Sequence, residues 1–322
     1  MSRTHPARAI IFDTDPGVDD VMALAFLTRL PGVELRAITT TFGNLALEAT
    51  TRNALTIAER FGLDVPVAQG AAHALQNDQP RFVPHVHGAD GLGDVHLPVP
   101  RRTVDPRPAA DVIIDLVRRD PGAITLVGVG PFTNLAHALH KAPEIAGLVA
   151  GVSLMGGAFG THGHTGNVSP VAEANVAADP WAADIVLGAS WPVTMIGLDV
   201  TQEVVMDEAY LAALRDQAAD AGRLIWDISR FYQRFHEQTR GLRGVFAHDS
   251  LAVAHAVRPD LFTTRSGSVR AVAGGIAHGQ TIQKPRGLLC APSSWDDRPE
   301  QAVAVGVDGG AFLDLYRRVL VA

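Results

Sequence analysis

The chain of 322 residues is 47% hydrophobic and 19% charged, which is the balance of a globular protein and excludes a disordered chain. Its formal net charge of −7 excludes a nucleic-acid groove, because such a groove needs a basic stripe to neutralise phosphates. No apolar run approaches the roughly 18 residues that a membrane span requires, so we expect neither nucleic acid nor a membrane as a partner.

The N-terminal segment and the single cysteine set further expectations. The segment of residues 1–8 is short and polar, and the apolar run Ala9–Phe12 is too brief for the apolar core of a signal peptide. We therefore expect a cytoplasmic protein. Cys290 is the only cysteine, which excludes an intrachain disulfide and a multi-cysteine zinc site. Its neighbours Leu288, Leu289 and Ala291 are apolar, and they predict a buried structural thiol.

Short apolar runs alternate with helix-like stretches as far as Asp199. The expected strands are Ala9–Phe12, Leu35–Thr41, Val65–Ala68, Ile124–Val129, Val152–Met155 and Val193–Leu198. The expected helices between them are Val18–Leu30, Leu47–Phe61, Ala109–Arg119, Phe132–His140 and Pro180–Ala189. Continuous apolar strands that alternate with helices predict an open, mainly parallel α/β sheet, mixed at its edge, with helices on both faces in a Rossmann-like arrangement.

After Asp199 the pattern becomes more helical. Asp207–Gln217 and Gly222–Thr239 are expected helices. The second carries a stripe of apolar residues at helical spacing, formed by Leu224, Ile225, Ile228, Phe231, Tyr232 and Phe235. This stripe predicts packing and not a binding surface. No linker or internal repeat interrupts the chain, so we expect a single domain over residues 1–322.

Four carboxylates stand within eight residues at the end of the first expected strand: Asp13, Asp15, Asp19 and Asp20. Carboxylates that converge on one turn repel one another, so they need solvent, protons or a cation between them. Oxygen ligands without adjacent histidine or cysteine suit a hard ion, Ca²⁺ or Mg²⁺. Helix capping and the helix dipole explain Asp19 and Asp20 equally well, but they do not explain the two acids at the strand end.

The run Asp13–Asp20, which reads DTDPGVDD, resembles the N-terminal signature of the inosine–uridine-preferring nucleoside hydrolase family. Later motifs resemble further landmarks of that family in the expected order: residues 39–44 (TTTFGN), 87–91 (HGADG), 126–134 (LVGVGPFTN), 154–157 (LMGG), 172–175 (AEAN), 179–180 (DP), 197–199 (GLD) and 248–249 (HD). The resemblance spans most of the chain. It implies hydrolysis of the N-glycosidic bond of ribonucleosides, with inosine and uridine or pyrimidine nucleosides favoured.

The same resemblance implies a role for each polar residue in these motifs. It places Ca²⁺ among the carboxylates of Asp15, Asp20 and Asp249 and the backbone carbonyl of Val129, with Asp13 orienting these ligands. Asp15 would also be the general base that activates water. The residues assigned to the ribose hydroxyls are Asp19, Asn44, Asn167, Glu173 and Asn175. Met155 either packs against the sugar or belongs to the core.

Two histidines are candidates for protonating the departing base. His248 directly precedes Asp249, and His87 lies on a glycine-rich loop with His85 and Asp90. The His87 loop is expected to close over the base as a lid, with a solvated histidine as the alternative. His162 and His164, on another glycine-rich loop, are expected to be solvated.

The chain also departs from the family pattern near the base. Gln238–Ala247 holds no tyrosine, where some relatives place one against the base, and Ala174 stands where close relatives often have phenylalanine. Arg240 or Arg243 could reach the base, or each could be solvated. The base preference therefore stays open.

Two other functions fit parts of the pattern. A Mg²⁺-dependent phosphatase of the haloacid-dehalogenase type also begins with DxD after a strand and would use Asp13 as its nucleophile. It normally needs a lysine near the phosphate, and the two lysines, Lys141 and Lys284, lie beside no strand-end motif. A catalytically inactive nucleoside-binding protein is the second alternative. The resemblance further implies a homo-oligomer, either a dimer or a tetramer, with a small-molecule substrate.

Overall fold

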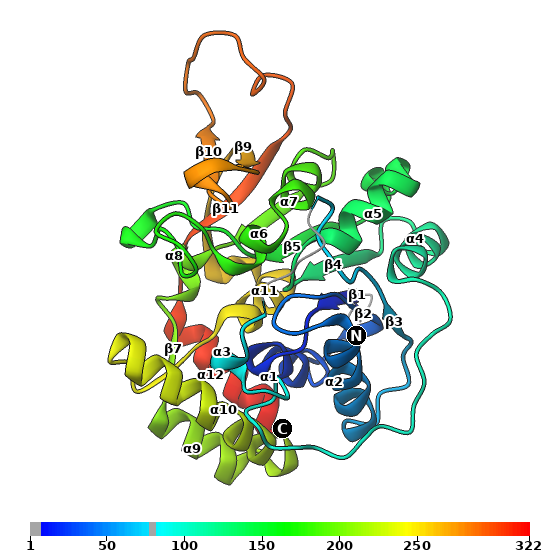
Figure 1. Ribbon diagram of the computed structural model, residues 1–322, viewed down its shortest axis with the longest axis vertical. Helices are drawn as coiled ribbons and strands as arrows, with labels where there is room; N and C mark the ends of the chain where they lie inside the picture. Colours follow the sequence, from blue (N-terminus) through cyan, green and yellow to red (C-terminus); the bar gives the residue numbers. More distant parts are fainter. Residues whose placement is uncertain (1–7, 77–81) are drawn as a thin grey trace, which may run out of the picture.

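The computed structural model describes residues 8–76 and 82–322, and the prediction made for residues 1–7 lies outside them. Within this described part, nine strands form one sheet in the order β10-β9-β11-β6-β5-β4-β1-β2-β3 (Figure 1). Their bounds are β1 Arg8–Thr14, β2 Val33–Thr40, β3 Val67–Gln69, β4 Ile124–Gly128, β5 Gly151–Met155, β6 Val193–Ile196, β9 Phe262–Ala271, β10 Thr281–Pro285 and β11 Glu300–Val307. β7 (Val205–Asp207) pairs with β8 (Gly244–Phe246) separately.

Neighbouring strands from β3 to β11 are parallel, whereas β9 is antiparallel to both β11 and β10. The prediction of an open, mainly parallel sheet with a mixed edge is therefore confirmed. β1 has β2 on one side and β4 on the other, so the chain changes direction across the sheet at β1. In open α/β sheets, ligands bind at the carboxyl ends of the strands beside such a switch point.

Helices cover both faces, because alternate residues of a buried strand point to opposite sides. In β1, Ile10 and Phe12 enter one core cluster, and Ala9 and Ile11 enter the other. The first cluster packs against α1 (Val18–Leu27), α2 (Leu47–Arg60), α9 (Glu208–Gln217), α10 (Ala219–Arg240), α11 (His248–Val257) and α12 (Gly309–Val321). The second packs against α4 (Ala109–Arg119), α5 (Thr133–Lys141) and α7 (Pro180–Leu187).

The expected elements up to residue 199 correspond to β1–β6, α1, α2, α4, α5 and α7, with small shifts at their ends. Three short helices in this part were not expected: α3 (Pro84–His87), α6 (Ala174–Ala178) and α8 (Leu198–Thr201). The expected start of α10 at Gly222 is wrong, because this glycine lies inside the helix. A Cβ atom there would stand 1.9 Å from the carbonyl oxygen of Leu214, so Gly222 serves the close packing of α9 on α10.

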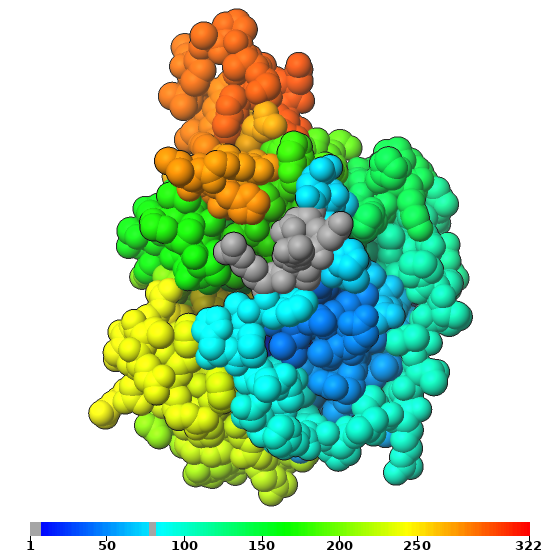
Figure 2. All heavy atoms as spheres, viewed as in Figure 1, coloured from blue at the N-terminus to red at the C-terminus, as the bar shows by residue number. Residues whose placement is uncertain are grey.

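The strands β9, β10 and β11 were not expected from the sequence. They form an arm that projects from the rest of the molecule, with the loop of residues 286–299 at its tip (Figures 1 and 2). Cys290 lies in this loop and is exposed, so the prediction of a buried thiol is wrong. Its apolar neighbours Leu288 and Leu289 are exposed as well, because no helix covers the tip of the arm.

No helix in residues 8–76 and 82–322 combines the length and the apolar character needed to cross a membrane.

Candidate active site

A cavity of about 870 Å³ lies at the carboxyl ends of four neighbouring strands. Its lining includes Asp15 after β1, Asn44 after β2, Val129 after β4 and Met155 at the end of β5. These are the strand ends on both sides of the switch point at β1. The sequence motifs therefore meet where an open α/β sheet offers a ligand site.

One wall of the cavity is the turn that joins β1 to α1. Gly17 is the N-terminal cap of α1, and its N–H donates to the carboxylate of Asp20 at 2.9 Å. The same carboxylate accepts the N–H of Asp15 at 3.2 Å and the hydroxyl of Thr14. Asp20 therefore caps the helix, as its position predicts, and it also fixes the shape of the turn around Asp15.

The carboxylate of Asp15 lies between two glycines that follow other strands. A Cβ atom on Gly43, after β2, would stand 2.0 Å from its Oδ2, and one on Gly130, after β4, would stand 2.6 Å from its Oδ1. Only a glycine lets the backbone approach so closely. Oδ2 accepts the N–H of Asn44 at 2.7 Å, whereas Oδ1 is buried without a hydrogen-bond partner among the described residues. A buried, unpartnered carboxylate oxygen is costly, so this atom is a candidate cation ligand.

Further carboxylates converge on the same place. Oxygen atoms of Asp19, Asp20 and Asp249 lie within 4.8 Å of one another. Burial raises the pKa of Asp15 and of Asp249 well above the usual range, and the neighbouring acids raise both further. Burial also raises the pKa values of Asp19 and Asp20 to about 6. Carboxylates this buried favour protonation unless a cation lies among them. The donor set fits a hard divalent ion, which takes carboxylate and carbonyl oxygens.

The three carboxylates whose oxygens lie within 4.8 Å of one another are not the three that were predicted as metal ligands. The close group contains Asp19, whereas the predicted group contains Asp15. The carboxylate of Asp19 contacts His87 and Tyr232. Its Oδ1 lies 3.8 Å from Nδ1 of His87, and its Oδ2 accepts the hydroxyl of Tyr232 at 3.4 Å. Asp15 instead places its unpartnered Oδ1 beside Gly130, the residue after Val129. Asp20 and Asp249 belong to both sets, so the two sets differ only in the third carboxylate.

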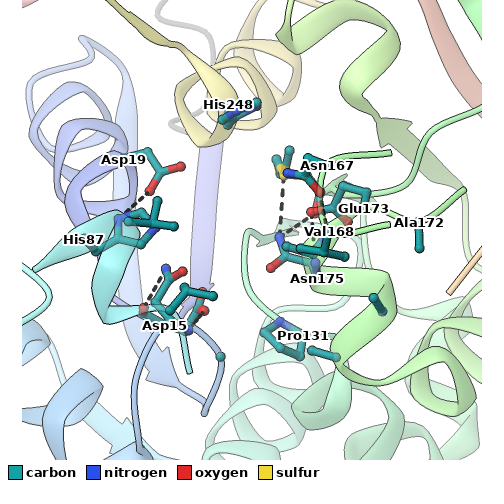
Figure 3. A pocket seen from close by; sticks show the side chains of 18 of the residues that line it. Asp15, Asp19, His87, Pro131, Asn167, Val168, Ala172, Glu173, Asn175 and His248 are labelled. Atoms are coloured by element: carbon teal, nitrogen blue, oxygen red, sulfur yellow. Dashed lines mark hydrogen bonds and ion pairs between the residues drawn. The ribbon is translucent and has the colours of Figure 1, made fainter. Parts of the chain in front are cut away.

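Amide and carboxyl groups face this acidic wall from across the cavity. Figure 3 shows Asn167, Glu173 and Asn175 opposite Asp15 and Asp19. Asn175 lies in the first turn of α6, and Glu173 caps this turn through the N–H groups of residues 175 and 176. Oδ1 of Asn167 accepts the N–H of residue 174 at 3.0 Å, which ties its loop to the same helix start. Burial raises the pKa of Glu173 to about 6.

Asn175 connects this wall to two strand ends. Its Nδ2 donates to the carbonyl oxygen of Val129 at 2.7 Å and to that of Met155 at 3.1 Å. It also lies 3.5 Å from Sδ of Met155. Met155 is 3% exposed and belongs to the core cluster, as one of its two expected positions requires, and it also lines the cavity. Its contact with a sugar stays a prediction.

His87 is buried, which excludes the solvated alternative. It is the last residue of α3, and its Nδ1 accepts the backbone N–H of Val18 at 3.2 Å. Because Nδ1 is an acceptor, the neutral ring carries its proton on Nε2. Burial lowers the pKa of His87 to about 4.

His248 is the first residue of α11 and is 6% exposed. Its Nδ1 lies 2.8 Å from the hydroxyl oxygen of Thr201, at the end of α8. Burial, together with nearby His236 and Arg240, lowers the pKa of His248 to about 3. Both candidate acids are therefore uncharged imidazoles near neutral pH.

The structure adds a wall of which the sequence analysis named only Arg240 as a candidate. Tyr232, Phe235, His236 and Arg240 of α10 line the cavity together with Phe246 of β8. Tyr232 and Phe235 pack in and against the core, as the stripe on α10 predicts, and both also line the cavity. Helical periodicity showed which face of α10 is apolar, but it could not show that part of this face borders a cavity.

Aromatic rings of this wall connect the two candidate acids. The ring centroids of His87 and Tyr232 are 5.0 Å apart, and those of Tyr232 and His236 are 4.4 Å apart. His236 lies 5.1 Å from Phe246, which in turn lies 5.4 Å from His248. A planar base could stack against such a row of rings. Tyr232 thus supplies a tyrosine near the cavity, although residues 238–247 hold none.

Asp13 is not part of the cavity lining. The side chain of Asp13 bonds to Thr39 and Asn134, and no bond joins it to a predicted ligand side chain. Its link to the site is its backbone carbonyl, which accepts the N–H of Val129 at 2.8 Å. Burial raises the pKa of Asp13 to about 7. Asp13 therefore supports the site through the backbone, and the expected side-chain contact with a ligand is not seen.

The remaining basic groups divide between cavity and surface. Arg240 lines the cavity, whereas Arg243 pairs with Glu237 at 3.4 Å and is not part of the lining. Lys141 pairs with Asp111, and Lys284 pairs with Asp296. Neither lysine lines the cavity, so the phosphatase interpretation lacks the lysine that it needs near the substrate. His162 and His164 bond to Val305 and Glu203 and also lie outside the lining.

Comparison with known proteins agrees with this geometry. Residues 10–314 match the family model described as inosine-uridine preferring nucleoside hydrolase. The chain is 39% identical over 274 residues to uridine nucleosidase 1 of Arabidopsis thaliana, covering 85% of this chain and 81% of that protein. A plant nucleoside hydrolase structure superposes with a TM-score of 0.94 at 34% identity, covering 98% and 100% of the two chains. The purine-preferring ribonucleoside hydrolase from Gardnerella vaginalis gives 0.89 at 38% identity, covering 97% and 98%.

Proposed function

Because the chain belongs to the inosine-uridine preferring nucleoside hydrolase family, and so is an enzyme that cleaves the N-glycosidic bond of ribonucleosides, we propose that it does so with Ca²⁺ and favours uridine and inosine. The observation that carries the Ca²⁺ proposal is the gathering of buried acids at the cavity, where one oxygen of Asp15 and one of Asp19 have no hydrogen-bond partner in the part of the chain that the structure describes. The similarity to a uridine nucleosidase supports the base preference.

Asp15, Asp20 and Asp249 are the proposed side-chain ligands, and the carbonyl of Val129 is the fourth. We choose Asp15 over Asp19 because its free Oδ1 lies beside the residue that follows Val129. A flexible, all-oxygen set of this kind suits Ca²⁺, whereas Mg²⁺ demands stricter octahedral geometry. When bound, the cation would orient a water molecule and lower its pKa.

The reaction replaces the bond from ribose C1′ to the base nitrogen with a bond to a water oxygen. Asp15 is the proposed general base, because its carboxylate lies at the cavity beside the place proposed for the cation and its water. Burial raises the pKa of Asp15, and a bound cation would counter that effect and keep the carboxylate ionised, so that it can take a proton. The sugar passes through a transition state with oxocarbenium character. Several hydrogen bonds to the ribose hydroxyls would stabilise this state. The proposed ribose contacts are Asp19, Asn44, Asn167, Glu173 and Asn175, with Met155 against the sugar ring.

The departing base needs a proton or a hydrogen bond on its ring nitrogen. His248 and His87 are the proposed donors, and both are uncharged near neutral pH because burial lowers their pKa values. A neutral imidazole with its proton on Nε2 can donate a hydrogen bond as negative charge develops on the base. The N–H of Val18 donates to Nδ1 of His87 and so supports this tautomer for His87. The hydroxyl of Thr201 beside Nδ1 of His248 can donate or accept, so it allows this tautomer for His248 without selecting it.

We further propose that residues 1–322 form a single hydrolase domain. We propose that the enzyme works in the cytoplasm, as a homodimer or a homotetramer. Trp181 and Ile185, one turn apart on α7, are 49% and 45% exposed, which supports a subunit contact on that helix. Light scattering measures the mass in solution, and a mass equal to one chain would reject the oligomer.

Ribose release from a panel of uridine, inosine, cytidine, adenosine and guanosine tests the function. We expect release from uridine and inosine, loss of release in excess chelator, and recovery when Ca²⁺ is restored. Phosphate release from phosphomonoesters, measured in parallel, tests the phosphatase alternative. Intact nucleosides after prolonged incubation with Ca²⁺ would instead indicate a binding protein without catalysis.

A further inference from the structure

Two loops of the site meet outside the cavity. One is the turn of residues 15–17 between β1 and α1, the acidic turn. The other is the loop of residues 88–96 that follows His87, the His87 loop. The second loop is folded by Asp90, whose carboxylate accepts the N–H groups of Leu92 at 2.7 Å, Asp94 at 2.9 Å and His96 at 2.9 Å. These hydrogen bonds fold the loop into one unit, whose position is set by its contacts with neighbouring elements.

Asn53 of α2 stands between these two loops. Its side-chain Nδ2 donates to the carbonyl oxygen of Pro16 at 3.1 Å and to that of Asp90 at 2.9 Å. An amide nitrogen carries two protons, so both are used in bridging the loops. Asn53 is 3% exposed, and it does not line the cavity. Its amide therefore has no direct access to a substrate.

The loop is pressed closely onto this amide. Gly91 has a φ of +79°, and a Cβ atom on it would stand 2.9 Å from Nδ2 of Asn53 and 2.6 Å from Cδ1 of Leu45. The close approach and the positive φ both require glycine. On the cavity side, the N–H of Val18 donates to Nδ1 of His87. Two separate contacts thus join the acidic turn to the segment that carries His87.

We infer that Asn53 is a positioning residue for catalysis: its amide clasps the acidic turn to the His87 loop and so sets where His87 lies relative to Asp15 and Asp19. This inference rests on the proposed function. Removing the amide leaves the buried carbonyl oxygen of Pro16 and the partly buried carbonyl oxygen of Asp90 without this donor, which favours separation of the loops. A misplacement of about 1 Å in a catalytic group can lower the rate about 100-fold.

Asn53→Leu removes both donated hydrogen bonds at similar side-chain volume. We expect amide hydrogen exchange in residues 88–96 to become at least about 10-fold faster, because the folded unit loses its anchor. We expect kcat for ribose release to fall about 30-fold with KM changed far less. Thr56→Val is the matched control on the same helix, since its hydroxyl bonds only to the carbonyl of Arg52, and it should change neither readout.

Gly91→Ala tests the same contact from the loop side and leaves α2 untouched, which keeps the inference testable if Asn53→Leu does not fold. The added methyl group should push the loop from Asn53 and give the same faster exchange and lower kcat. Unchanged exchange and kcat in a folded variant would overturn the inference, as would an equal effect of Thr56→Val. Absence of ribose release by the unmodified enzyme would reject the proposed function instead, and hydrogen exchange would still decide on the clasp.

Discussion

The acids at the strand ends define the chemistry at the scale of single residues. Burying a carboxylate without a partner costs free energy, and placing several together adds repulsion. The structure nevertheless buries Asp15, Asp20 and Asp249 beside Asp19, with raised pKa values for all four. A divalent cation would offset both costs, which is why the same residues that destabilise an empty site can serve catalysis.

Asp15→Asn tests the base assignment. The amide keeps the shape of the side chain but cannot take a proton from water, so we expect ribose release to fall about 1,000-fold. The fold should persist, because the substitution removes a buried charge and leaves the oxygen that accepts the N–H of Asn44. Activity assays and melting temperatures measure the two effects. Turnover at the normal rate would refute the assignment.

His248→Ala tests the assistance given to the leaving base. We expect natural nucleosides to slow about 100-fold, because their bases leave poorly without a donor. A riboside with an activated leaving group, such as p-nitrophenyl riboside, should slow far less. Comparison of kcat/KM for the two substrates measures the difference. Equal slowing would mean that His248 acts on another step.

His255 gives a test of stability against pH away from the site. Burial lowers its pKa from 6.5 to about 4. Between these values the unfolded chain binds the proton and the folded chain does not, so the free energy of unfolding decreases as the pH falls through this window. The contribution is complete above pH 6.5 and amounts to about 3 kcal/mol at most, from about 1.4 kcal/mol per pKa unit. His255→Gln should therefore lose less stability between pH 7 and pH 4.5 in urea denaturation. An identical loss in both proteins would contradict this account.

At the scale of elements, the site is built from loops whose backbones must approach one carboxylate. Gly130→Ala would place a methyl carbon 2.6 Å from Oδ1 of Asp15, so the carboxylate must turn away from the Val129 carbonyl. We expect ribose release to fall about 100-fold with little change in melting temperature. Gly147→Ala is the matched control, because no atom lies within 4 Å of its added methyl group. Similar activity in the two variants would show that the close contact at Gly130 does not matter.

Elements differed in how far the sequence could predict them. β1, β4 and β5 are buried along most of their length and form apolar runs, and the second half of β2 is buried as well. Their carboxyl ends could therefore be located, together with Asp15, Asn44, Val129 and Met155. β9 and β10 lack such runs, because the first half of β9 is largely uncovered and β10 is short and partly exposed. β11 does contain an apolar run, AVAVGV, and was missed all the same. Tyr232 and His236 were missed for another reason: a cavity wall formed between α10 and β8 depends on tertiary packing that no local pattern records.

At the scale of the whole molecule, the strand order explains why residues far apart in sequence share one site. β1 lies beside β4, so Asp15 and Val129 become neighbours, and α11 then brings Asp249 to the same cavity. The fold class was predictable because alternating strands and helices leave few topologies. The choice between Asp15 and Asp19 as the third ligand was not, because it depends on how each carboxylate turns within a buried cluster.

The central claim is that the acids at the cavity share one divalent cation, and Ca²⁺ binding tests it most directly. Equilibrium dialysis of the metal-free enzyme should show one Ca²⁺ per chain, with binding weakened strongly in Asp20→Asn and Asp249→Asn. Asp15→Asn should weaken binding more than Asp19→Asn. Absence of Ca²⁺ binding, together with ribose release that persists in chelator, would contradict the account.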